Sequence, residues 1–541
     1  MSLEERFGEL RSFLEKRPSS QTFDLVIQAL EAGAKTNEDR VRAEWLPYAE
    51  QRLASWPDHT RLCPKRRNDE FVAGESIWQS LIRALDYVGE KMGKNQMEDF
   101  LAAPGLENIT CLDMRSTSMT WDKVAEFAER APCRLKSFGF RRVSSLDDAA
   151  LVTLFSSKML AECEHLNFRG WDKGATQVFD VLMAHFPLSN LTRLDLAGGV
   201  ISSRKLGELL ATNQLDNLEV LDLGTWVSDK RRTGFISKLA KHGGLKNLRE
   251  LHIEGHKPKE IEVLAKSDAF SELRELDLRG ELSTKSLGHI LESEHLQNLE
   301  SLRIYVTGKD AADCIAMLAA SERLAGIRSL HLSWYANDGN VPKQTYADLF
   351  ESPHIVNLER FAITLDRADA LPLLFHAEKL ANLQELLLDE VDDSDDALKM
   401  AAREAFEATS LRKLRRFSSC LYKNGDLFVE ELIMSALPEQ LTSLRVQNVK
   451  AARLIDLFKS PRTRNIEHLD LSDMGYPESR DVIPSLSKAT QLKSLRYLIM
   501  DSHYRVDDLR EHVGEHGYNL PELLHVGCPE YAFLQSRDWL G

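Results

Sequence analysis

The chain has 541 residues, of which 43% are hydrophobic and 28% are charged, a composition that excludes global disorder. Single cores rarely grow beyond roughly 250–300 residues, so this length predicts several domains or a repeat architecture. The formal net charge of −15 repels phosphate backbones and anionic lipid, which makes nucleic acid and membrane unexpected as main partners.

Two further features bear on location. No stretch has the roughly 18–20 continuous apolar residues that span a bilayer, and the N-terminal sequence MSLEERFGELRSFLEKR has no apolar core of a signal peptide. The seven cysteines are odd in number, scattered, and never spaced as CxxC. Free thiols in a reducing compartment are therefore expected, and the predicted location is the cytoplasm.

Residues 1–105 show helical rather than repeat periodicity. Leu3, Phe7, Leu10 and Leu14 share one helical face, and further helical stretches are expected around 23–32, 39–56 and 78–93. We predict a small helical domain that caps the first repeat, since terminal repeats otherwise expose their apolar faces.

A short apolar motif then recurs along the chain. It reads LTRLDL at 191–196, LEVLDL at 218–223, LRELHI at 248–253, LRELDL at 273–278, LESLRI at 299–304 and LQELLL at 383–388. Weaker copies extend the series from ITCLDM at 109–114 to LRYLIM at 495–500, with a degenerate copy at 520–526. The spacing is about 28 residues, which gives about 15–16 repeats over 106–527.

Each repeat combines two periodicities. The end of the motif alternates with the period of two that is typical of a strand with one buried face. The intervening sequence has helical spacing, as at Leu206, Leu209 and Leu210. Because a lone repeat cannot bury its apolar face, neighbours must stack, with the strands in one parallel sheet and the helices behind it.

This pattern resembles the leucine-rich repeat family, in its longer, ribonuclease-inhibitor-like class, and residues 42–56 resemble small helical domains that accompany bacterial members. The resemblance implies an α/β solenoid, a curved horseshoe with a parallel β-sheet on the concave face and helices on the convex face. The family's Asn or Cys at the ninth motif position is mostly missing here, since that position holds Gly199, Trp226, His256 and Glu281. We therefore expect the turns after the strands to be satisfied in another way.

The C-terminal segment 528–541 carries Tyr531, Phe533, Leu534, Trp539 and Leu540. Such a concentration of aromatic and aliphatic side chains in a short tail favours a second cap, because the last repeat also needs its open face covered.

The concave sheet face is the expected binding surface, and its centre carries residue types that often anchor interfaces. The predicted partner-binding residues are Glu275, Asp277, Arg279, Arg303, Tyr305, His331 and Trp334. Trp334 is expected to point outward, although it could instead fold back over its own loop. The Asp residues in the LDL motifs either make the face acidic or only keep the sheet soluble.

A second surface is predicted on the first repeats. Arg115, Arg141 and Arg169 hold one position of three successive motifs. Stacked guanidinium groups repel unless carboxylates compensate them, so this strip could bind a phosphorylated or other anionic ligand by bidentate hydrogen bonds. The alternative is three splayed, hydrated side chains.

The sequence offers no catalytic machinery that we recognise. The HxxEH spacing of His512, Glu515 and His516 matches an inverted zinc-protease signature, but Gly514 weakens its helix and no third ligand is evident. We expect no enzyme activity, no metal and no cofactor. The predicted function is a protein-binding scaffold acting as adaptor, sensor or inhibitor. A substrate-recruiting subunit of an enzyme complex and an anion binder remain alternatives, and the oligomeric state is open.

Overall fold

The computed structural model describes residues 2–64, 67–87, 94–114, 119–140, 147–169, 175–197, 201–224, 234–241, 245–254, 256–334, 341–391, 394–420, 425–471, 489, 491–495, 497–500 and 525–527. The chain divides into two compact units, Met1–Glu272 and Leu273–Gly541. Each unit is described separately.

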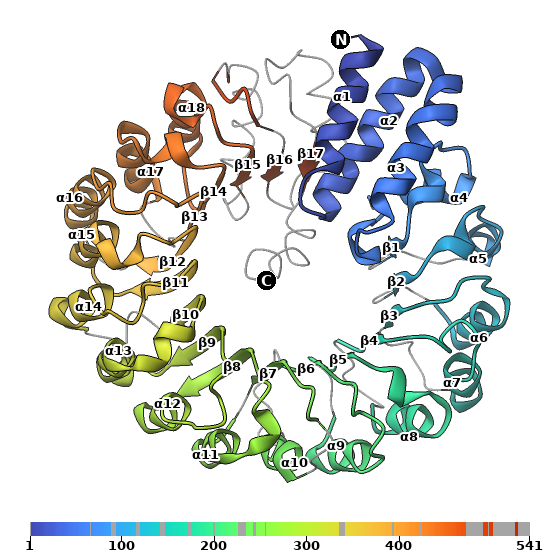
Figure 1. The fold of residues 1–541 in the computed structure, drawn as a ribbon, viewed down its shortest axis with the longest axis horizontal. Coiled ribbons are helices and arrows are strands. Elements are labelled where there is room, and N and C mark those ends of the chain that lie inside the picture. The colour runs from blue at the N-terminus through green and yellow to red at the C-terminus, as the bar shows by residue number, and fades with distance from the viewer. Residues whose placement is uncertain are drawn as a thin grey trace. The chain divides into compact units, whose positions relative to one another are not determined.

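The first unit begins with helices and continues as strand–helix repeats (Figure 1). Its helices are α1 (Leu3–Leu14), α2 (Ser20–Arg40), the π-helix η1 (Val41–Trp45), α3 (Leu46–Leu53), α4 (Asn68–Ala73), α5 (Lys94–Leu101), α6 (Trp121–Arg130), α7 (Asp148–Phe155), α8 (Ala175–His185), α9 (Ser203–Leu210), α10 (Phe235–Lys241) and α11 (Pro258–Lys266). Its strands are β1 (Ala84–Asp86), β2 (Cys111–Met114), β3 (Ser137–Phe140), β4 (His165–Asn167), β5 (Arg193–Asp195), β6 (Val220–Leu223) and β7 (Glu250–Glu254).

The N-terminal helices form a small packed cluster. Phe7 of α1 stacks on Trp45 with ring centroids 5.1 Å apart, and Trp45 is fully buried. A side chain at Gly33 of α2 would overlap the Trp45 ring, so only glycine lets the ring pack against this helix. Glu31 of α2 accepts hydrogen bonds from Trp78 Nε1 and Arg67 Nη2, both at 2.8 Å, which ties the helices to the segment that leads into β1.

The strands of the first unit form one parallel sheet whose register follows the repeat motif. Leu112, Phe138, Leu166, Leu194 and Leu221 are register partners on successive strands, and each is at most 2% exposed. Their inward alternation explains why the motif predicts the strands so well.

The sheet begins earlier than the motif indicated. Strand β1 pairs with β2, with Leu85 opposite Leu112, so the parallel sheet already includes part of the segment 1–105 that we assigned to a cap. The division into a cap at 1–105, repeats at 106–527 and a cap at 528–541 stays a prediction. The segment 528–541 lies outside the described residues.

The second unit repeats the same strand–helix pattern. Its strands are β8 (Glu275–Leu282), β9 (Ser301–Val306), β10 (Ser329–Ser333), β11 (Arg360–Leu365), β12 (Glu385–Val391), β13 (Arg416–Ser419), β14 (Ser443–Val446), β15 (His468–Leu471), β16 (Tyr497–Met500) and β17 (His525–Gly527). Its helices are α12 (Thr284–Leu291), α13 (Ala311–Ala320), α14 (Lys343–Phe350), α15 (Leu371–His376), α16 (Asp395–Phe406), α17 (Gly425–Met434) and α18 (Ala451–Lys459). All its paired strands run parallel.

In each unit the strands line the inner side of an arc and the helices its outer side (Figure 1). Helices are wider than strands, so a stack with one of each per repeat must curve toward its sheet. This architecture confirms the predicted fold, an α/β solenoid of the leucine-rich-repeat type.

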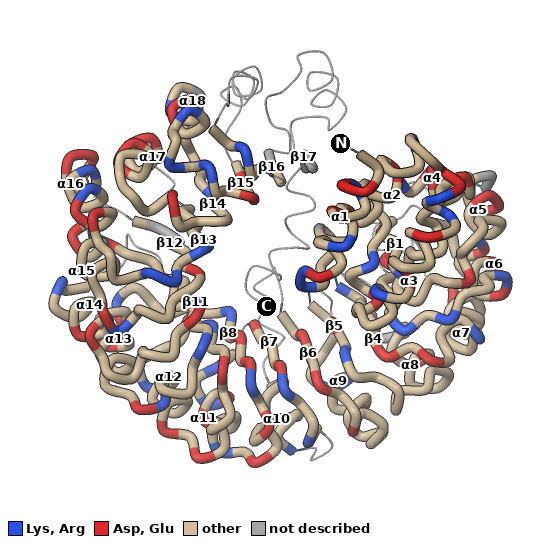
Figure 2. The backbone as a smooth tube through the Cα atoms, turned by 45° about the horizontal axis from the view of Figure 1, so that its top comes forward, with Lys and Arg blue, Asp and Glu red and all other residues tan. Residues whose placement is uncertain are grey.

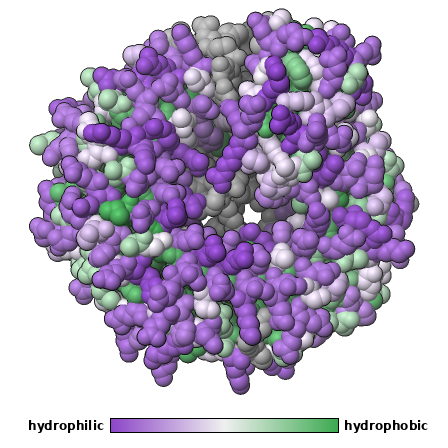
Figure 3. All heavy atoms as spheres, viewed as in Figure 1, coloured by the Kyte–Doolittle hydropathy of each residue, from purple (hydrophilic) through white to green (hydrophobic). Residues whose placement is uncertain are grey.

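The surface is predominantly polar. Lysine, arginine, aspartate and glutamate are spread over the helices of both units (Figure 2). Hydrophilic residues cover most of the face that Figure 3 shows, with apolar residues scattered singly. In the part of the chain that the structure describes, no helix is long and apolar enough to cross a membrane.

Candidate functional site

Three strands of the first unit end in the same side-chain hydrogen bond. The outward residues Asn167, Asp195 and Asp222 each accept, through Oδ1, the backbone N–H of the residue two positions later, at 3.0, 3.0 and 2.8 Å. This is the Asx turn that Asn and Asp favour. These side chains replace the missing ninth-position Asn in satisfying the turn. Neither interpretation of the LDL aspartates in the sequence included this role.

Of the three arginines in the predicted anion-binding strip, the structure describes Arg169, and its guanidinium group lies near the protein's own carboxylates. Arg169 Nε lies 3.6 Å from Asp195 Oδ2, and its Nη2 lies 3.3 Å from Asp222 Oδ2. His252 Nδ1 lies 3.5 Å from the same Asp222 oxygen. Asp195 and Asp222 therefore compensate the charge of Arg169, which weakens its predicted role in an anion-binding strip. Arg115 and Arg141 lie outside the described residues, and the strip stays a prediction there.

In the second unit the structure brings the predicted central residues together. Asp277, Arg303 and His331 are register partners on β8, β9 and β10. Arg279 donates to Asp277 Oδ2 through Nε at 3.0 Å and Nη2 at 2.9 Å, and Arg303 Nη1 lies 3.9 Å from that oxygen. Burial and, to a smaller extent, Arg303 lower the pKa of His331 to about 3, so the imidazole is neutral at pH 7. Whether these residues bind a partner stays a prediction.

Strands β8 and β9 are longer than the strands of the first unit, so the sheet is wider here along the strand direction. Strand β8 continues through a bulge at Gly280, whose φ of 138° suits glycine, and pairs again at Glu281. Tyr305 lies opposite Glu281 on one side and Ser333 on the other. A third outward position is thereby added to the two found on the short strands, and half-buried Tyr305 occupies it. Glu275, another predicted partner-binding residue, lies at the start of β8 and is the register partner of Ser301 on β9.

The outward orientation predicted for Trp334 is wrong. Trp334 is 2% exposed and stacks on Tyr346 of α14 with ring centroids 6.4 Å apart. Tyr346 in turn donates to Asp366 Oδ1 at 2.8 Å. The reason is parity: Trp334 follows buried Leu332 by two residues, so the period of two places both on the inward side. Tyr305 follows outward Arg303 by two residues and is correctly placed.

Sequence reasoning also missed a row of asparagines just before the strands. Asn190, Asn217 and Asn247 in the first unit each donate through Nδ2 to a backbone carbonyl of the preceding repeat, at 2.9, 2.8 and 2.7 Å. Asn357 and Asn382 do the same in the second unit at 2.8 Å. The signal was available, since Asn directly precedes the first leucine of these motifs.

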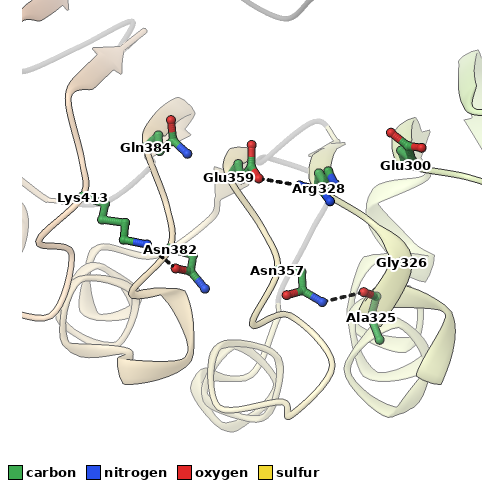
Figure 4. A pocket seen from close by; sticks show the side chains of 9 residues that line it. All are labelled: Glu300, Ala325, Gly326, Arg328, Asn357, Glu359, Asn382, Gln384 and Lys413. Carbon is green, nitrogen blue, oxygen red and sulfur yellow. Dashed lines mark hydrogen bonds and ion pairs between the residues drawn. The ribbon is translucent and has the colours of Figure 1, made fainter.

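This edge of the second unit is hollowed to about 460 Å³ (Figure 4). The hollow contains the ion pair of Arg328 with Glu359 at 2.8 Å and the hydrogen bond of Lys413 to Asn382 at 2.8 Å. The first unit has a hollow of about 470 Å³ at the equivalent edge, lined by its own asparagines. Recurrence at the same repeat position indicates that repeat geometry produces both hollows.

A second feature that the motifs did not reveal is a charged triplet on β11, β12 and β13. Arg360, Glu385 and Arg416 are register partners on these strands. Glu385 is 8% exposed, and Arg416 Nη1 lies 3.4 Å from its Oε2. Burial raises the pKa of Glu385 to about 7, while Arg416 and Arg360 oppose that rise. The neighbouring outward residues are Ala362 and Leu387.

Two observations bear on possible catalytic chemistry among the described residues. Among them, no group of three or more His, Cys, Asp or Glu side chains is placed to hold a metal ion. Burial raises the pKa of the thiols of Cys111 and Cys314 to about 11 and of Cys133 and Cys163 to about 12, which makes them poor nucleophiles. The HxxEH segment at 512–516 lies outside the described residues.

No protein-family model and no curated protein matches this sequence. Among solved structures, the yeast Rad7 and Elc1 complex matches with 18% identity over 70% of this chain and 83% of that chain, at a TM-score of 0.40. An internalin from Listeria monocytogenes matches with 12% identity over 88% of this chain and 98% of its own, at a TM-score of 0.23. A Bacteroides fragilis protein has 12% identity over 60% of this chain and 68% of its own, at a TM-score of 0.24. These similarities are too distant to transfer a role, and the fold rests on the repeat geometry itself.

Proposed function

We propose that this protein is a non-catalytic scaffold that binds another protein on the outward sheet face around β8–β10, in the cytoplasm. The observation that carries the proposal is the widened sheet, where Arg279, Arg303 and Tyr305 lie on adjacent strands around Asp277. Arginine and tyrosine are the residue types that most often anchor protein interfaces. The odd, unpaired spacing of the cysteines supports a reducing location.

The repeats also support the finer assignment to the longer, helix-containing class of leucine-rich repeats. Regular helices follow most strands, and those of the second unit are 6 to 12 residues long. A parallel sheet of this extent offers many side chains at a strand spacing of about 4.8 Å, which suits a protein partner better than a metabolite.

The test is site-specific photo-crosslinking in the cells from which the protein comes. A photoreactive phenylalanine derivative replaces Tyr305 in one variant and Met400 in a matched control. Met400 is 74% exposed on α16 and therefore accessible to bystander proteins. We expect a discrete protein adduct at position 305 that is absent at position 400, and Arg303→Ala should reduce its yield without changing the circular dichroism spectrum. Identical adducts at both positions, or none at position 305, would refute the proposal.

A further inference from the structure

Among the side chains that the structure describes, the outward face of β9–β14 is rich in arginine. Its described charged side chains are four arginines and one carboxylate: Arg303, Arg360, Arg416, Arg445 and Glu385. The whole chain has a net charge of −15. A basic strip on an acidic protein concentrates attraction for negative groups on one surface.

The four arginines differ in their pairing with the protein's own carboxylates. Arg303 and Arg445 form ion pairs with Asp277 and Asp470 at 3.9 and 3.6 Å. Arg416 lies 3.4 Å from Glu385. Among the described residues, no carboxylate lies within 4.0 Å of the Arg360 guanidinium. Arg360 therefore retains capacity for an external carboxylate, and the exposed side chain of Arg416 is accessible to one.

Apolar and small side chains lie between these arginines. Ala362 and Leu387 are register partners on β11 and β12, and Ser418 follows on β13. Of these three side chains only Leu387 is partly exposed, and Ala362 and Ser418 are buried. A polyphosphate backbone has no apolar atoms that could contact Leu387, and the net negative charge of the protein repels phosphate groups. A protein segment can supply both carboxylates and apolar atoms.

The strand spacing also fixes the distance between Arg360 and Arg416. Arg360 and Arg416 occupy the same column two strands apart, which corresponds to about 10 Å at the usual strand separation. An extended chain in the polyproline II conformation places every third side chain on one side, about 9 Å apart. Acidic residues three apart in such a segment would match the two arginines.

We propose that the outward face of β9–β14 binds an extended protein segment whose acidic side chains recur at every third residue, with Arg360 and Arg416 each receiving one carboxylate. This inference rests on the proposed protein-binding function and names the chemistry of the partner. Glu385, between the two arginines, is a competing carboxylate of the protein itself.

The test uses the full chain and two peptides of equal composition. One repeats Pro-Pro-Glu three times, and the other holds three consecutive Glu residues between two Pro-Pro-Pro segments. We expect the spaced peptide to bind more tightly by about fivefold or more. Arg360→Gln should weaken it about tenfold, as expected for loss of one charge-assisted hydrogen-bonded pair, and Glu385→Gln should tighten it. Arg328→Gln, outside the strip, should leave it unchanged.

Misfolding cannot explain weaker peptide binding by Arg360→Gln together with tighter binding by Glu385→Gln. Equal affinity for both peptides, no binding of either, or no effect of Arg360→Gln would overturn the inference. A single-stranded oligonucleotide that binds more tightly than the spaced peptide, with the same dependence on Arg360, would replace it with nucleic-acid binding. If the adduct at Tyr305 persists while the peptide test fails, the scaffold function stands and only the acidic-segment inference falls.

Discussion

Glu385→Gln should raise stability, and the gain should depend on pH. The pKa of Glu385 is raised from 4.5 to about 7 by burial, so the folded state binds a proton that the unfolded state releases between these pH values. Stability therefore falls as the pH rises from 4.5 to 7, and the loss is complete above pH 7. A shift of this size corresponds to about 3 kcal/mol at 1.36 kcal/mol per pH unit. Glutamine mimics the protonated side chain and escapes this loss.

The assay is urea-induced unfolding of both proteins between pH 4 and pH 8.5. We expect the difference in unfolding free energy to grow from near zero at pH 4 to about 3 kcal/mol at pH 8. Arg416 is 44% exposed on its side chain, so losing its ion pair to Glu385 should cost little. The control is Glu359→Gln, whose carboxylate is 39% exposed beside Arg328. A wild-type and Glu385→Gln difference that stays constant across the pH range would refute the reasoning.

Two further predictions concern the first unit. Gly33→Ala should destabilise the N-terminal helices by about 1–3 kcal/mol because its methyl group overlaps Trp45. Gly8→Ala should be neutral or stabilising, since no atom lies within 4 Å of the added carbon. Thermal unfolding compares the two variants, and equal shifts in melting temperature would contradict the packing. Asp222→Asn keeps the acceptor of the turn but removes the charge beside Arg169. It should lower the free energy of unfolding less than Asp222→Ala, which also leaves the buried N–H of Gly224 without its acceptor. Urea unfolding that ranks the two variants the other way would exclude the Asx-turn role.

The sequence by itself determined the repeat, because the period of two and the spacing of leucines are local properties of the chain. Leu112, Leu194 and Leu276 lie where the motif predicts, each on a strand with its side chain buried. The sequence analysis missed β1, although IRALDY at 82–87 has the apolar spacing of the motif and Leu85 precedes Leu112 by one repeat length. Pairing with β2 identifies this segment as a strand of the sheet.

The tertiary structure decided which outward residues interact. Glu385 lies 25 residues from Arg360 and 31 from Arg416 along the chain, yet strand register makes them neighbours. The same register gives Arg169 two carboxylates that no local pattern assigns to it. Side-chain alternation is set within a strand, whereas charge compensation is set between strands, so sequence predicts the first reliably and only the folded sheet fixes the second.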